Sequence, residues 1–139
     1  MNAYFQKPVC SEQRMAKKHS PRFLAAVGQS RALIQECDID QFSSMLNDGK
    51  ELVVIDVREQ HEYDAGSFEG ALHLSKGVIE RDIEKHPIPE DARIVLYCGG
   101  GFRSAIAAES LIRMGYSNVY SLWGGWRSLV AKGLASSNQ

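Results

Sequence analysis

The sequence predicts an α/β fold: a mostly parallel central sheet with helices on both faces, preceded by an N-terminal helical extension. Short apolar runs of strand length alternate with segments in which apolar residues recur at helical spacing. The clearest run, residues 52–57, is interrupted only by Asp56, as is typical of a parallel strand buried on both faces. Strands that alternate with helices are joined by crossovers, which leave them parallel in one sheet. The chain has 139 residues, 44% of them hydrophobic, which is enough for one globular core.

The first fifty residues are predicted to hold a tail and two helices. Residues 1–20 are polar and show no period, so we expect a mobile tail. Pro21 suits the start of a helix, and residues 21–35 are predicted to form a helical extension. The apolar residues expected on one face of this extension are Phe23, Leu24, Val27, Leu33 and Ile34. Asp40 is the expected N-cap of a second, short helix, which Gly49 ends.

The main domain is predicted to span residues 36–135, with residues 136–139 as a C-terminal tail. Its expected strands are residues 52–57, 71–74, 93–97 and 118–122. Its expected helices are residues 58–63, 77–85, a segment from about residue 104 to 115, and 126–132. In parallel sheets of this kind ligands bind at the carboxyl ends of the strands. The residues that directly follow a strand are therefore the first candidates for a site.

Cys98 is the most informative residue because it ends an apolar run and opens a glycine-rich turn into a helix. The turn reads Cys98-Gly99-Gly100-Gly101-Phe102-Arg103-Ser104. A thiol at this place faces unpaired amide groups and the positive end of the helix dipole, which favour the reactive thiolate. Three successive glycines leave the backbone open to an anion and permit unusual dihedral angles. The turn therefore predicts a nucleophile seated in an anion-binding loop.

Other interpretations of this turn fit the sequence less well. The simplest alternative is an ordinary glycine-rich connection with an inert, buried thiol. A dinucleotide-binding turn needs a third glycine where Ser104 stands and an acidic residue about 20 positions later, where none occurs. A phosphate-binding loop needs a Gly-Lys-Ser/Thr sequence, which does not follow. Cysteine phosphatases resemble one another in having five residues between cysteine and arginine, whereas four separate Cys98 from Arg103. The smaller ring suits a smaller group, such as one additional sulfur atom.

Four motifs, taken in order, give the chain a resemblance to a known family. They are residues 52–59 with Glu62-Tyr63, the turn Gly66-Ser67-Phe68-Glu69-Gly70-Ala71, the loop from Tyr97 to Ser104, and Leu122-Trp123-Gly124-Gly125-Trp126. Over roughly residues 36–135 these motifs are similar, in order and spacing, to those of the rhodanese-like sulfurtransferases. Four motifs in this order are far more specific than any one of them.

The resemblance implies a two-step sulfur transfer that needs no metal and no organic cofactor. The Cys98 thiolate would attack the outer sulfur of a donor such as thiosulfate and expel sulfite. The resulting persulfide would be held by the amides of residues 99–104, until a small thiol or a protein acceptor removes the sulfur. Arg103 is expected to brace the loop and to add positive charge. The alternative, from a different class, is a rhodanese-like binding or regulatory module without turnover.

Three residues outside the loop are candidate supporting residues. Asp56 is expected to accept hydrogen bonds from nearby amides, and Arg58 to pair with Glu62. Glu80 is expected either to pair with Arg103 or to lie in solvent.

One position departs from the family pattern. Many family members carry arginine or lysine directly after the cysteine, where this chain has Gly99. We therefore predict weak affinity for thiosulfate, and a persulfide, for example on a protein, as donor or acceptor.

Charge and cysteine content argue against several other classes. A net charge of -1 gives no reason to expect nucleic acid or a membrane surface as the partner. The three cysteines form no CxxC pair, and no apolar stretch has the length of a signal-peptide core or a membrane span. We therefore expect a cytoplasmic protein. Three of the histidines, His19, His61 and His86, lack metal-ligand spacing with one another and with the cysteines, so no metal site is expected.

Overall fold

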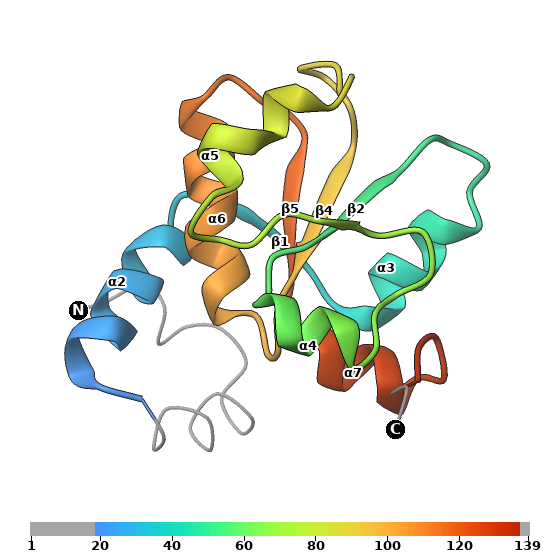
Figure 1. The fold of residues 1–139 in the computed structure, drawn as a ribbon, viewed down its shortest axis with the longest axis horizontal. Helices are drawn as coiled ribbons and strands as arrows, with labels where there is room; N and C mark the ends of the chain where they lie inside the picture. The colour runs from blue at the N-terminus through green and yellow to red at the C-terminus, as the bar shows by residue number, and fades with distance from the viewer. Residues whose placement is uncertain (1–18, 137–139) are drawn as a thin grey trace.

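The computed structural model describes residues 19–136, and a five-stranded parallel sheet forms its centre (Figure 1). The strands are β1 (Gln35–Cys37), β2 (Val53–Asp56), β3 (Leu72–His73), β4 (Ile94–Tyr97) and β5 (Val119–Leu122). Their order across the sheet is β1-β5-β4-β2-β3, and each neighbouring pair is parallel. The predicted α/β fold with a mostly parallel sheet is confirmed. The predicted tails lie largely outside the described residues, since residues 1–18 and 137–139 are not among them.

Helices cover both faces of the sheet, as predicted (Figure 1). On one face lie α6 (Phe102–Arg113) and α5 (Ile79–Asp82), which the short helix η2 (Ile83–Lys85) continues. On the other face lie α3 (Ile39–Leu46) and α7 (Gly125–Ala131). α2 (Pro21–Arg31) packs on α6, and α4 (Gln60–Asp64) follows β2 at the carboxyl end of the sheet. No helix within residues 19–136 is long and apolar enough to cross a lipid bilayer.

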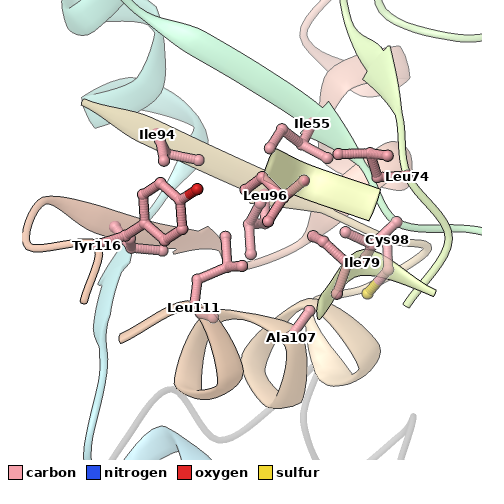
Figure 2. Close-up of a cluster of buried hydrophobic side chains, with 13 residues drawn as sticks. Ile55, Leu74, Ile79, Ile94, Leu96, Cys98, Ala107, Leu111 and Tyr116 are labelled. Atoms are coloured by element: carbon pink, nitrogen blue, oxygen red, sulfur yellow. The ribbon is translucent and has the colours of Figure 1, made fainter. Parts of the chain in front are cut away.

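Two hydrophobic clusters lie against the sheet, one on each face, and a third lies between α2 and α6. Neighbouring residues of a strand point to opposite faces, so Ile55 packs in the cluster with α6 while Val54 packs in the cluster with α3 and α7. Figure 2 shows the first of these clusters, with Tyr116 at one end and Cys98 at the other. The carboxyl end of β4 thus carries Cys98 to the edge of the core, beside the start of α6.

The structure corrects the predicted organisation before the main domain. The helix predicted over residues 21–35 ends at Arg31, and Gln35–Cys37 form an edge strand that pairs with β5. This strand is short and mixed in polarity, so its sequence carries no apolar run to mark it. Leu33 was expected on the buried face of the extension but is 66% exposed, because it follows the helix end.

The second helix begins two residues earlier than predicted. Asp38, rather than Asp40, caps α3, because its carboxylate accepts a hydrogen bond from the Gln41 amide at 2.8 Å. The Gln41 side chain in turn accepts one from the Asp38 amide, also at 2.8 Å. This reciprocal pair is a capping box, a signal that the spacing of Asp38 and Gln41 carries.

Candidate active-site loop

The loop between β4 and α6 wraps around the sulfur atom of Cys98. Sγ accepts hydrogen bonds from the backbone amides of Gly101, at 3.1 Å, and Ser104, at 3.3 Å. Gly101 is the N-cap of α6 with a φ of 114°, a region that favours glycine, and it provides no capping side chain. The sulfur therefore takes the place of the capping group at the positive end of a 12-residue helix. Two backbone donors and the start of a helix thus face the sulfur.

The start of α7 holds the opposite side of the same loop. The carbonyl oxygens of Cys98, Gly99 and Gly100 accept hydrogen bonds from the amides of residues 126, 127 and 124, at 2.7, 3.2 and 3.0 Å. Three successive carbonyl groups are thereby bound to α7 and its N-cap. Because each peptide unit is planar, fixing its carbonyl also fixes the direction of its amide. The closing motif of residues 122–126 thus has a structural purpose: it orients the loop.

Gly125 is the residue of this contact that sequence analysis did not include among the site residues. Its φ is 49°, and a Cβ atom on it would overlap the Cys98 carbonyl oxygen. The same Cβ would come within 2.9 Å of Gly100 N and Gly99 C. Only a glycine allows α7 to approach the loop so closely. The Gly124-Gly125 pair was the available signal, but it was used only as part of the closing motif of residues 122–126 and not as part of the site.

Cys98 is almost completely covered. Its exposed fraction is 1%, and Figure 2 shows it beside Ile79, the first residue of α5. The two amides aimed at its sulfur fit the predicted anion-binding loop. The exposure is lower than expected for a nucleophile that meets its substrate directly. A donor can therefore contact the sulfur only after the groups that cover it move.

Arg103 lies beside the loop and is paired with Glu62 of α4. Its Nη1 and Nη2 donate to Glu62 Oε1 and Oε2 at 2.7 and 3.1 Å. The hydrogen bond from Arg103 lowers the pKa of Glu62 to about 2. The same pair raises the pKa of Arg103. A Cβ on Gly99 would lie 3.3 Å from Arg103 Nη2, so the guanidinium covers the position directly after the cysteine.

This ion pair decides between the two alternatives for Glu80 and corrects one expectation. Glu80 is exposed on α5, as its solvated alternative predicted, and the partner of Arg103 is Glu62. Arg58 was expected to pair with Glu62, but it donates to both carboxylate oxygens of Asp56 and to the Gly66 carbonyl. Helical spacing placed Glu62 near Arg58 along the chain, whereas Glu62 of α4 pairs with a residue of α6.

Asp56 and Arg58 form a buried ion pair that connects the elements around the loop. Asp56 accepts from the Arg58 amide at 2.9 Å, as expected, and also from the Tyr97 hydroxyl at 2.6 Å. The Arg58 guanidinium stacks on Trp126, with 4.5 Å between its central carbon and the ring centroid. Both charged groups are buried and satisfied. They therefore tie β2, the residue before Cys98 and the start of α7 together without reaching the sulfur.

The outer side of the loop is covered by the N-terminal helix. Phe102 is 5% exposed and packs with Val27 of α2, and its ring lies 5.1 Å from His19 and 5.8 Å from Trp123. Arg31 of α2 is itself buried and stacks on Trp123 at 3.8 Å. The segment expected to be an appendage thus forms one wall of the loop.

Cys37, the other described cysteine, has a different setting. Burial and the neighbouring carboxylates of Asp38 and Glu36 raise the pKa of its thiol to about 12. It is thus a protonated, structural thiol at neutral pH. Within residues 19–136, no group of three or more His, Cys, Asp or Glu side chains is placed to hold a metal ion.

Comparison with known proteins identifies the family of this chain. The sequence model of the rhodanese-like domain family matches residues 38–132. A sulfurtransferase of Allochromatium vinosum is 33% identical over 93 residues, which cover 67% of this chain and 85% of that protein. A tRNA uridine(34) hydroxylase of Buchnera aphidicola is 34% identical over 90 residues. These cover 62% of this chain but only 28% of the hydroxylase.

Solved structures agree on the fold. A human single-domain sulfurtransferase superposes with a TM-score of 0.64 over 70% of this chain and 96% of that one, at 22% identity. At this level of identity the similarity concerns the fold alone.

Proposed function

Because this chain belongs to the rhodanese-like domain family, we propose that it is a sulfurtransferase in which Cys98 carries the transferred sulfur as a persulfide. The observation that supports this most strongly is the binding of Sγ by the amides of Gly101 and Ser104 at the start of α6. Donors aimed at a sulfur stabilise negative charge there. The sulfurtransferase of Allochromatium vinosum supports the same class of chemistry.

The reaction proceeds in two half-reactions. In the first, the Cys98 thiolate forms a bond to the outer sulfur of thiosulfate, the sulfur–sulfur bond of the donor breaks, and sulfite leaves with the electron pair. In the second, an acceptor thiolate or cyanide bonds to that outer sulfur, and the Cys98 thiolate leaves with its electron pair. The loop amides then serve both steps, because they bind the sulfur when it is the nucleophile and when it is the leaving group.

The side chains beside the loop favour a donor other than thiosulfate. Thiosulfate is a dianion, and Gly99 supplies no cation for it. The nearest cation, Arg103, is already neutralised by two hydrogen bonds to Glu62. We therefore propose a persulfide, on a small molecule or a protein, as the physiological donor, and a thiol as the acceptor. Thiosulfate would act as a weak substitute in an assay.

The proposal is tested by weighing the intact protein after incubation with thiosulfate or a low-molecular-weight persulfide. We expect a gain of one sulfur atom, which cyanide removes with release of thiocyanate. A Cys98→Ser variant treated in parallel should gain nothing. Absence of the adduct with both donors, or its persistence in the variant, would refute a Cys98 persulfide.

Gly99→Lys is expected to lower the KM for thiosulfate about tenfold, the effect of one added charge-assisted hydrogen bond. The atom that a new Cβ would approach is the end of the flexible Arg103 side chain, so the substitution can be accommodated. Steady-state kinetics with thiosulfate and cyanide measure the effect. Gly99→Gln, which adds a similar side chain without charge, is the control. An equal KM in the two variants would show that the missing cation does not limit thiosulfate binding.

The low exposure of Cys98 favours a second candidate, a binding or regulatory module of the same family without turnover. A cysteine that is 1% exposed suits a structural role unless the loop opens. The two candidates differ in the mass experiment, because a module without turnover acquires no sulfur. A cysteine phosphatase is the third and weakest candidate, and hydrolysis of a small aryl phosphate would reveal it.

A further inference from the structure

We infer that Ser121 of β5 is a positioning residue for Cys98, acting through the hydroxyl group of Ser104. The two serine Oγ atoms are 2.8 Å apart, and Ser104 Oγ is 3.4 Å from Cys98 Sγ. Both serines are fully buried and Cys98 nearly so. The three groups form one chain that starts in β5, crosses the first turn of α6 and ends at the sulfur. The inference rests on the proposed function of Cys98.

The sheet explains why these groups meet. β5 lies next to β4, and Ser121 is paired in register with Leu96, two residues before Cys98. Val119, on the same face of the strand, and Leu122, the next residue, are buried and apolar. A hydroxyl in such a place costs stability unless it is hydrogen-bonded. Ser104 Oγ provides that bond for Ser121, and the chain continues to the sulfur.

The hydrogen atoms that the thiolate and the two hydroxyl groups carry decide which group donates in each hydrogen bond. A thiolate has no hydrogen and can only accept, so the Ser104 hydroxyl must donate to it. Ser104 then has its oxygen lone pairs left to accept, and the Ser121 hydroxyl can donate to them. Both hydroxyl dipoles point towards the negative charge, and such chains strengthen each bond in turn. The sulfur thus receives three donors: two amides and one hydroxyl that Ser121 orients.

Loss of the Ser121 hydroxyl should weaken this arrangement. Without the Ser121 hydroxyl as donor, the Ser104 hydroxyl is free to turn away from the sulfur towards a loop carbonyl three or four residues before it, as serines in helices commonly do. The sulfur would then be a less stable anion. It would also be a poorer leaving group when an acceptor removes the outer sulfur, so the second half-reaction should slow.

The test compares Ser121→Ala with Ser121→Thr, which keeps the hydroxyl and suits a strand. The first readout is the pH profile of Cys98 alkylation by iodoacetamide, followed by peptide mass with Cys37 as an internal reference. The second is the rate at which cyanide discharges the Cys98 persulfide. In the alanine variant we expect the alkylation midpoint to move to higher pH and discharge to slow about three- to tenfold, the effect of one hydrogen bond. The threonine variant should resemble the parent protein.

Ser110→Ala is the matched control, because Ser110 is a buried serine of α6, the helix that carries Ser104, and it takes no part in the hydrogen-bonded chain to the sulfur. It should leave both readouts unchanged. Should Ser121→Ala fail to fold, Ser121→Val and Ser121→Thr, which differ by the hydroxyl alone, replace the comparison. An unchanged midpoint and discharge rate in folded Ser121→Ala or Ser121→Val would overturn the inference. Failure of the parent protein to form a persulfide would instead refute the proposed function, since alkylation needs no sulfur donor.

Discussion

Gly125→Ala is expected to reduce persulfide formation at least about 100-fold, even in molecules that keep the fold, because a small displacement of reacting groups has effects of this size. The added Cβ would overlap the Cys98 carbonyl oxygen and crowd Gly100 N and Gly99 C, all backbone atoms of the loop. Backbone cannot turn away as a side chain can, so α7 and the loop must separate. The carbonyl groups of the loop would then lose their partners, and the Gly101 amide, which is aimed at the sulfur, would lose its direction.

Two measurements check this result: the intact mass after treatment with the donor, and the free energy of unfolding in denaturant. The clash together with the positive φ should destabilise the fold by about 3 kcal/mol. Gly133→Ala is the matched control, because Gly133 has a φ of 79° but no atom within 4 Å of the new Cβ. It should cost about 1 kcal/mol and leave persulfide formation intact. Equal behaviour of the two variants would show that the contact between α7 and the loop does not orient the amides.

The sequence predicted what depends on neighbours along the chain. β2 and β4 are buried apolar runs, so their position and parallel pairing followed from composition and length. The loop from Cys98 to Ser104 was predicted because a strand, three glycines and a helix occur in succession. Its amides do bind the sulfur, since the N-terminus of a helix offers unpaired donors wherever it forms.

The sequence could not predict what depends on contacts between distant elements. β1 is a strand because it adds to the edge of β5, and its own residues carry no strand pattern. Glu62 meets Arg103 because α4 lies at the same end of the sheet as the loop, a fact of the assembled fold. The same reason hides Ser121, which reads as one polar residue in a strand until β5 is seen beside α6.

The covering of Cys98 is also a property of the assembled fold. α5 is separated from the loop by a dozen residues or more, yet Ile79 lies beside the sulfur (Figure 2). Sequence predicted the amides around the sulfur but not the accessibility of the sulfur, because the amides at a helix start are local whereas exposure depends on every packed element.

Arg103→Met is expected to slow persulfide formation about 100-fold, because it removes the contact that holds the loop and a small displacement of reacting groups has effects of this size. Arg103 is the cation beside the loop, and its two hydrogen bonds to Glu62 hold α4 against the start of α6. Methionine keeps an unbranched apolar stem but removes the positive charge and both hydrogen bonds. The second-order rate constant with a persulfide donor measures the loss, and Arg103→Lys, which keeps charge without the bidentate geometry, should lose less. Equal rates for the Arg103→Met and Arg103→Lys variants would mean that the bidentate pairing of Arg103 with Glu62 is required and that a positive charge at this position does not help by itself.

Acid should weaken the contact between Glu62 and Arg103 in the unaltered protein, and the stability of the fold should show it. The pKa of Glu62 is lowered from an ordinary 4.5 to about 2, so its pairing with Arg103 stabilises the fold fully above the ordinary value. As pH falls from about 4.5 towards 2, the folded protein must give up this contribution when the carboxylate takes a proton. Glu62→Gln cannot ionise, so its stability relative to the parent protein should be lower at neutral pH and should converge with it as pH falls through this range. Denaturant unfolding of both proteins at several pH values follows the difference directly. A gap that stays constant with pH would show that the Glu62 charge contributes nothing to the contact between α4 and the loop, and that Arg103 is held there by packing alone.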